Sequence, residues 1–269
     1  MNTPIFVMSF ILSKYRQKKL ERDKQLFKLS FTLLKQLGYE VHFYGDDFAI
    51  NEFNDIPWDY KDNILEKINK KYYQTWSIGK LFTISEACNY YENFFHIDGD
   101  IFIFNNLPNN LIQNKITCFN KEPIYNFNRL YENCKFIPNE LKILPKQAYN
   151  MSFFGGPSFL IKDYIKSCLN FVLNNLNSNF FQDINQINTL LAILAEQGYF
   201  ACYSNFFNLN VQTIEEDLKL NNIIQHIRLQ YSEIATTHYD NINKLKNIIN
   251  IYNNNGGIKN IEAFDKLFM

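Results

Sequence analysis

The chain has few cysteines, the residues that hold disulfide-rich and zinc-binding small folds together. Its 269 residues include five widely spaced cysteines and no Cys-x-x-Cys pair: Cys88, Cys118, Cys134, Cys168 and Cys202. An odd number of scattered cysteines suggests neither a disulfide framework nor a zinc site. We therefore expect reduced, mostly buried thiols, as in a cytoplasmic protein.

The sequence also lacks an excess of charge, with 27 basic against 27 acidic residues. A neutral chain has no field that attracts nucleic acid, so nucleic-acid binding is not expected. The densest basic stretch, residues 14–24, is interpreted as a solvated loop and helix start. The alternative is weak peripheral contact of this stretch with the inner face of a membrane, where an acceptor would lie.

Long apolar runs and several enzyme motifs are absent. The apolar residues 4–12 lack a basic start and end at the charges that begin with Lys14, which predicts a core strand and not a signal peptide or membrane span. There is no Walker A loop, GxGxxG, HExxH or GxSxG motif. The four histidines are too scattered for a histidine-rich metal site: His42, His96, His226 and His238.

What the chain does contain is a large apolar fraction, 46 %, which excludes global disorder. Hydrophobic patterns predict strands at residues 5–10, 39–44, 94–97 and 101–104, and helices at 23–37 and 76–91. Gly38 is expected to cap the first helix. No linker divides the chain, so we predict one α/β domain, residues 1–269, with a mixed, mostly parallel central sheet flanked by helices.

The second half is less regular. Residues 121–148 carry three of the seven prolines and show weak periodicity, which predicts a long loop or insertion. A strand and turn at 151–156 and helices at 163–176 and 183–197 are expected. Gly198 is expected to end the last helix before a strand at 199–203, as at Gly38. Residues 211–269 are expected to form a C-terminal extension that closes the site.

Two carboxylates, Asp98 and Asp100, stand two residues apart between apolar segments. Oxygen ligands of this kind suit Mg²⁺ and Mn²⁺. Partial desolvation of the pair is costly unless a cation or hydrogen-bond donors compensate. The alternative is a polar hairpin turn between two strands. His96 nominally shares a strand face with Asp98, and we expect it to be a hydrogen-bonded core residue.

Three segments carry a resemblance to a known family: Trp76-Ser77-Ile78-Gly79-Lys80-Leu81-Phe82-Thr83, Phe95-His96-Ile97-Asp98-Gly99-Asp100-Ile101-Phe102 and Phe153-Phe154-Gly155-Gly156. Over about residues 30–245 the chain resembles uncharacterised bacterial proteins that look like GT-A glycosyltransferases. The resemblance implies a Rossmann-like GT-A fold. It also implies transfer of a hexose from a nucleotide sugar, a UDP-sugar first, to a hydroxyl acceptor, in bacterial surface glycan synthesis.

The resemblance also implies roles for particular residues. Asp100 would bind Mn²⁺ or Mg²⁺ directly, and Asp98 would contact the ribose, or the metal through water. Lys80 would reach the phosphates or sugar of the donor; the alternative is an exposed helix lysine. Gly155 and Gly156 would let the backbone pass close under the donor sugar; the alternative is a plain turn.

Asp46 and Asp47 follow the second predicted strand. Nucleotide base or ribose contacts are common at this position in such sheets. The alternative is that both are turn residues that cap the next element.

The acceptor side is expected in residues 180–188. Related enzymes tend to carry an acidic residue followed by glutamine there, whereas this chain has Asn185 before Gln186, with Asp183 two residues earlier. These three are the candidate catalytic residues. The alternative for Asp183 is a helix N-cap.

In GT-A enzymes generally, a late histidine often supplies a further metal ligand, and a basic residue after it meets the departing phosphates. His238 and Lys244 stand in that relation, with Lys246 as the fallback. A histidine ligand would favour Mn²⁺ over Mg²⁺. His226 is the rival, although its isoleucine neighbours indicate a strand or core position. The alternative for residues 236–244 is a surface turn.

A glycosyltransferase with a glycan or lipid-linked acceptor is the leading hypothesis. A haloacid-dehalogenase-type phosphohydrolase also uses a DxD after an apolar strand, but usually on the first strand of its domain. A third hypothesis is a homologue that binds a nucleotide or a partner without catalysis, which Asn185 in place of an acid keeps open.

Overall fold

The computed structural model describes residues 3–12, 20–75, 77–108, 111, 114–123, 134, 136–142, 145–176 and 194–226. Its core is a seven-stranded sheet in the order β10-β6-β9-β4-β1-β2-β3. The strands are β1 (Ile5–Phe10), β2 (Val41–Gly45), β3 (Tyr60–Asp62), β4 (Asn93–Ile97), β6 (Ile116–Cys118), β9 (Phe153–Pro157) and β10 (Val211–Thr213). Only β9 runs antiparallel to its neighbours among these strands. The predicted mixed, mostly parallel sheet is confirmed.

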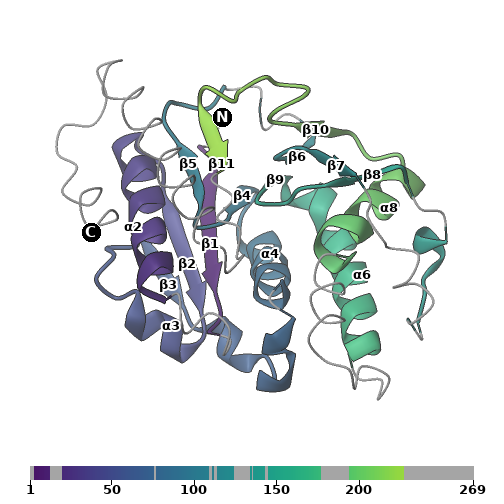
Figure 1. The fold of residues 1–269 in the computed structure, drawn as a ribbon, viewed down its shortest axis with the longest axis horizontal. Helices are drawn as coiled ribbons and strands as arrows, with labels where there is room; N and C mark the ends of the chain where they lie inside the picture. The colour runs from purple at the N-terminus through teal and green to yellow at the C-terminus, as the bar shows by residue number, and fades with distance from the viewer. Residues whose placement is uncertain are drawn as a thin grey trace, which may run out of the picture.

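Helices cover both faces of this sheet (Figure 1). On one face lie α4 (Ile78–Tyr90), α6 (Ser158–Leu176) and α8 (Tyr199–Phe206), and on the other lie α2 (Leu20–Gln36) and α3 (Asp47–Glu52). Two short 3-10 turns, η1 (Ile64–Lys67) and η2 (Lys70–Gln74), precede α4. None of the helices in the described ranges combines the length and apolar character needed to cross a membrane.

The continuous apolar runs of the central strands reflect burial on both faces. Phe94 and Phe95 are successive residues of β4 and both are fully buried. Phe94 packs in the cluster that includes α4, α6 and α8, whereas Phe95 packs in the cluster that includes α2. The two faces of β1 and β4 therefore pack in two separate hydrophobic clusters.

Most elements of the first half confirm the predictions within a few residues. The α2 helix ends at Gln36, and Gly38 takes the left-handed conformation of a helix cap, with φ +80°. The prediction of mostly buried cysteines is also confirmed, because four of the five are buried, and none of the five takes part in a disulfide.

The predicted strand at residues 199–203 is wrong. This segment belongs to the α-helix α8, which continues directly from the π-helical turn η5 (Leu194–Gly198). Gly198 has helical φ −70° and ψ −42° and so does not end the helix. The rings of Tyr199, Phe200 and Tyr203 all pack against Tyr164 of α6. A short buried apolar run cannot be assigned to strand or helix by its periodicity alone.

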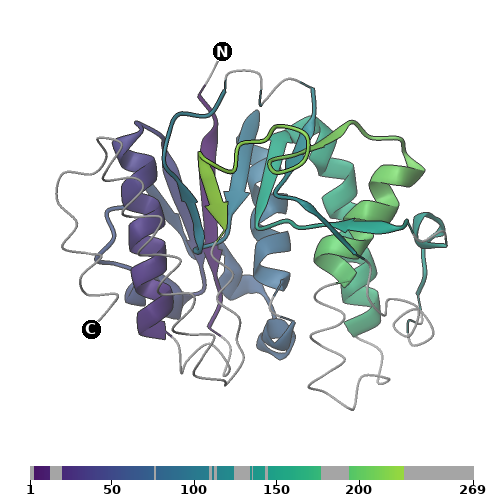
Figure 2. The same cartoon turned by 45° about the horizontal axis from the view of Figure 1, so that its top comes forward.

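Two small antiparallel sheets accompany the central sheet in the described part of the chain. β5 (Ile101–Ile103) pairs with β11 (Ile224–His226), and β7 (Lys121–Pro123) pairs with β8 (Gln147–Tyr149). Figure 2 shows the β5–β11 ribbon beside α2, which contacts β5. The predicted loop at 121–148 therefore has paired strands at its ends, and its described interior includes the 3-10 turn η4 (Asn139–Leu141).

The start of the predicted C-terminal extension is part of these sheets. β10 is the edge strand of the central sheet, and β11 joins β5 next to the Asp98–Asp100 turn. Residues 227–269 lie outside the described part of the chain.

Candidate functional site

The order of the strands creates a topological switch point between β1 and β4. From β1 the chain continues to β2 and β3 on one side, and it then returns to β4 on the other side of β1. In open α/β sheets, ligands bind outside the carboxyl ends of the strands at such a point. β4 ends at Ile97, and Asp98-Gly99-Asp100 follow at once. The motif predicted from sequence therefore lies where the topology favours a ligand.

The Asp98–Asp100 turn is held from two sides. The backbone N–H of Asp98 donates to the Ser152 carbonyl at 2.8 Å, and that of Ile101 donates to the Asp98 carbonyl at 3.1 Å. A Cβ atom on Gly99 would lie 2.2 Å from the ring of Phe27 in α2. The missing side chain of Gly99 thus allows α2 to pack directly on the turn.

The alternative of a hairpin turn is wrong. β4 and β5 flank the motif, but β4 pairs with β1 and β9 in the central sheet. β5 instead pairs with β11 in a separate sheet. The motif therefore connects two sheets, and its carboxylates stay partly exposed, 32 % for Asp98 and 25 % for Asp100.

Asp98 is anchored by Lys80 from the first turn of α4. The Lys80 Nζ atom lies 2.7 Å from Asp98 Oδ1 and also pairs with the Glu196 carboxylate. It donates to the Met151 carbonyl at 3.3 Å. Burial by itself would lower the pKa of Lys80, but Asp98 and Glu196 outweigh it and raise that pKa, which keeps the ammonium charged. Burial raises the pKa of Asp98, with Lys80 opposing and Asp100 reinforcing the shift.

Lys80 is thus not the exposed helix lysine of the alternative, since its side chain is only 6 % exposed. Its charge is directed at two carboxylates of its own chain. Direct contact of Lys80 with donor phosphates stays a prediction.

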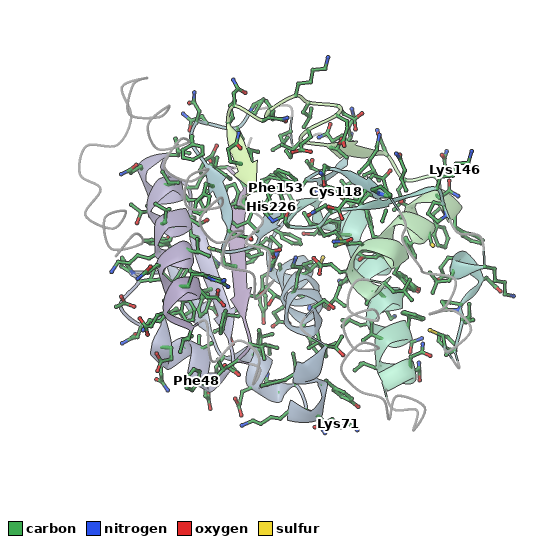
Figure 3. All side chains as sticks on the ribbon, viewed as in Figure 1. Phe48, Lys71, Cys118, Lys146, Phe153 and His226 are labelled. Atoms are coloured by element: carbon green, nitrogen blue, oxygen red, sulfur yellow. The ribbon has the colours of Figure 1, made fainter. Side chains whose placement is uncertain are left out.

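Asp100 faces His226 from the neighbouring ribbon. Asp100 Oδ2 lies 3.6 Å from His226 Nε2, and His226 Nδ1 lies 3.2 Å from Ser152 Oγ. Burial opposes ionisation of Asp100, but His226 outweighs it and lowers the pKa of that carboxyl. The His226 ring also packs edge-on against Phe119. Figure 3 labels His226 beside Phe153, which follows Ser152 in the chain.

His96 is the hydrogen-bonded core residue that we predicted. Its Nε2 atom lies 2.8 Å from Ser9 Oγ on β1, and the side chain is 1 % exposed. Burial, with the nearby Lys80 charge, lowers the pKa of His96 well below its ordinary value. The imidazole is therefore neutral and has a structural role between β1 and β4.

Asp46 and Asp47 have different roles at the end of β2. Asp46 is buried, and its side chain accepts a 2.8 Å hydrogen bond from the Ala49 N–H, so it is the N-cap of α3. The capping alternative is thus confirmed for Asp46. Asp47 is exposed and accepts a hydrogen bond from Asn63. Asp47 helps to line an open hollow of ≈ 430 Å³ with Ile50, Asn51, Lys61, Asp62 and Asn63.

The role of Asp46 as the N-cap of α3 can be tested by mutation. Asp46→Ala should lower the free energy of unfolding by about 1 kcal/mol, because an N–H at the start of α3 loses its acceptor. Asp47→Ala should change it by less than about 0.5 kcal/mol, because that side chain is exposed. Urea denaturation of the two variants measures both values. Equal losses would contradict the assignment of Asp46 as the cap.

Gly155 and Gly156 lie inside β9, so the alternative of a plain turn is wrong. A Cβ atom on Gly155 would lie 2.1 Å from the Phe94 carbonyl oxygen. At Gly156, with φ +138°, it would lie 2.4 Å from the Lys115 carbonyl oxygen. Both glycines therefore permit close backbone packing of β9 between β4 and β6. Their contact with a donor sugar stays a prediction.

Sequence reasoning missed Glu196 and Ser152 and ranked His226 second. The sequence does contain a signal that could have identified Glu196, because it is an isolated acidic residue between the apolar residues 190–195 and 199–203. Ser152 carried none. The candidate catalytic residues Asp183, Asn185 and Gln186 lie outside the described residues, as do His238, Lys244 and Lys246.

The charges of the site suit one divalent cation. Asp98, Asp100 and Glu196 contribute three carboxyl groups beside the ammonium of Lys80 and the imidazole of His226, so carboxyl groups outnumber basic groups among these residues. Within the described ranges, no group of three or more His, Cys, Asp or Glu residues is arranged to hold a metal. Mg²⁺ is usually bound through one or two carboxylates together with substrate phosphates. Asp98 and Asp100 fit that mode of binding.

Comparison with curated proteins gives no match. A family model described as "Family of unknown function (DUF6734)" matches residues 21–256. This range contains every described residue of the site, from Lys80 to His226. The chain therefore belongs to this family of unknown function, DUF6734.

Proposed function

We propose that the protein is a metal-dependent glycosyltransferase that transfers a sugar from a nucleotide sugar to a hydroxyl acceptor. One observation carries the proposal: two partly exposed carboxylates, Asp98 and Asp100, follow β4 at the switch point of a mostly parallel sheet. A ligand that brings phosphates and a divalent ion matches both the position and the charge of this pair.

The proposed role of the pair is to hold Mn²⁺ or Mg²⁺ against the diphosphate of the donor. A divalent ion there would neutralise the charge that grows on the diphosphate as the glycosidic bond breaks. Asp100 is the proposed direct ligand, with Asp98 beside it. His226 is the described imidazole nearest to this pair, and a nitrogen ligand would favour Mn²⁺.

The surrounding residues orient these groups. Lys80 contacts both oxygens of Asp98, at 2.7 and 2.9 Å, and so fixes the plane of that carboxylate. Ser152 contacts His226 Nδ1, which leaves Nε2 directed at Asp100. Such supporting contacts fix the orientation of metal ligands. Lys80 would thus act on a donor through Asp98.

The proposal also assigns residues to the nucleoside of the donor and to the acceptor. Asp47 is the proposed contact for the base or ribose of a UDP-sugar, because it lines an open hollow near the ends of β2 and β3. The acceptor is proposed to be a glycan or a lipid-linked glycan. Asp183, Asn185 and Gln186 remain the candidates for its activation.

A thermal-shift screen of nucleoside diphosphates with and without Mn²⁺ tests the proposal. We expect UDP to raise the Tm only when Mn²⁺ is present. At 100 times its Kd, a ligand stabilises by about 2.7 kcal/mol, and each kcal/mol raises the Tm of a chain of this size by about 2–4 °C. If another nucleoside diphosphate raises the Tm in place of UDP, the base assigned to the donor changes, but the proposed class of enzyme stands.

His226→Ala and His238→Ala extend the same screen. We expect His226→Ala to raise the Mn²⁺ concentration that gives half of the UDP shift. If only His238→Ala does so, the ligand predicted first from the sequence is the correct one. A wild-type protein that no nucleoside diphosphate stabilises with Mn²⁺ would remove the proposal. Binding without transfer of any sugar would favour a non-catalytic nucleotide-binding protein.

A further inference from the structure

Glu196 is the most deeply buried carboxylate of the site, 3 % exposed. It lies in η5 (Leu194–Gly198), a π-helical turn at the start of α8. Turns of this kind are rare and frequently occur at functional sites. A buried carboxylate is costly without a charged partner, and the contact with Lys80 offsets part of that cost for Glu196.

Lys80 is fully engaged by three acceptors. An ammonium group has three N–H donors, and the described acceptors around Nζ are the Asp98 carboxylate, the Glu196 carboxylate and the Met151 carbonyl. These come from the end of β4, from η5 and from the residue before Ser152. The ammonium therefore has one geometry, and Asp98 is held in that geometry with it.

The charge of Lys80 matters for any cation at Asp98. A lysine paired with Asp98 alone would cancel the charge of that carboxylate and repel a divalent ion close to it. Glu196, the second carboxylate in contact with Lys80 Nζ, offsets the charge of the ammonium. Asp98 can thus be held firmly by a cationic side chain and still present negative charge toward solvent, where its side chain is 32 % exposed.

We propose that Glu196 is a positioning residue for the metal site: through Lys80 it sets both the orientation of Asp98 and its availability to a divalent cation. The inference rests on the proposed function only in taking Asp98 as part of the cation site. It adds a residue to that site that lies 116 positions from Lys80 in the chain.

Mn²⁺ titrations of purified protein, without nucleotide and with UDP, test this role. Glu196→Gln keeps the size of the side chain and removes its charge. We expect it to raise the Kd for Mn²⁺ by about 10–100-fold, the usual effect of removing a residue that supports a metal ligand. Glu140→Gln is the control, because the described hydrogen bonds of the Glu140 carboxylate come from Ser167 and Tyr199 and not from Lys80. It should leave the Kd unchanged.

A second pair of variants separates positioning from a general effect on the fold. In a Lys80→Met background the contact that links Glu196 to Asp98 is missing, so Glu196→Gln should change the Kd for Mn²⁺ by less than about threefold. If Glu196→Gln weakens binding equally in both backgrounds, the residue does not act through Lys80.

Glu196→Asp covers the case in which Glu196→Gln does not fold. It keeps the charge and shortens the reach, so it should weaken Mn²⁺ binding by about threefold or more if position matters. Unchanged binding in a folded Glu196 variant would overturn the inference while the proposed function stands. A wild-type protein that binds Mn²⁺ neither alone nor with UDP would overturn both. Mn²⁺ binding without any UDP binding would overturn the proposed function alone.

Discussion

Asp100→Ala should abolish sugar transfer and Mn²⁺-dependent binding of UDP while leaving the protein folded. A bound metal supplies several kcal/mol of charge stabilisation in a transition state, which corresponds to a loss in rate of about a thousandfold or more. Asp100 is 25 % exposed and faces His226 at 3.6 Å, a contact that is an ion pair only when the histidine is protonated. Its removal should therefore cost less than about 1 kcal/mol of stability.

Three measurements check this expectation. Transfer from a UDP-sugar, the UDP-dependent Tm shift and urea denaturation should be compared for wild type, Asp100→Ala and Asp55→Ala. Asp55 is a control, because it is an exposed carboxylate paired with Lys28 on the α2 side of the molecule. Wild-type transfer in EDTA, or by Asp100→Ala, would rule out a metal role for Asp100.

The second large effect is expected on stability. Lys80→Met removes the ammonium group that pairs with Glu196 and with Asp98. Removing one partner of a buried ion pair costs about 3–5 kcal/mol, because the other charge stays buried and loses that pairing. We expect a loss of that size in the free energy of unfolding. Lys80→Met combined with Glu196→Gln should recover a substantial part of it.

Lys28→Met is the matched control for this change. Lys28 pairs with Asp55 at 3.3 Å, but both side chains are at least half exposed, 50 % and 56 %. Exposed pairs contribute about 0–1 kcal/mol, so this variant should be close to wild type in urea denaturation. A Lys80→Met protein as stable as Lys28→Met would contradict the view that the buried Lys80–Glu196 pair stabilises the fold.

The sequence predicted the parts of the molecule that local patterns determine. β1, β4 and α2 follow from apolar runs and helix signals, and the Asp98–Asp100 motif follows from carboxylates set between such runs. The switch point between β1 and β4 was not predicted, because the order of strands within a sheet is set by pairing between distant segments. Local pattern failed at residues 199–203, where helix or strand was decided by packing against Tyr164.

Contacts between distant segments were beyond local pattern. Ser152 and His226 meet across 74 positions, and His226 reaches Asp100 only because β11 pairs with β5. Lys80 stood in a recognisable motif, but nothing near it in the chain indicated Glu196 as its partner. In each case the fold, and not the neighbouring sequence, brings the second charge or hydroxyl to the first.

The contact between Gly99 and Phe27 has a consequence for relatives of this protein. The ring of Phe27 occupies the space that a side chain at position 99 would need. The size of the side chain at position 27 therefore limits the size of the side chain at position 99, although position 27 lies in α2 and position 99 in the Asp98–Asp100 turn. A relative with alanine or serine between the two aspartates should carry a smaller residue at the position of Phe27, and the two substitutions should occur together.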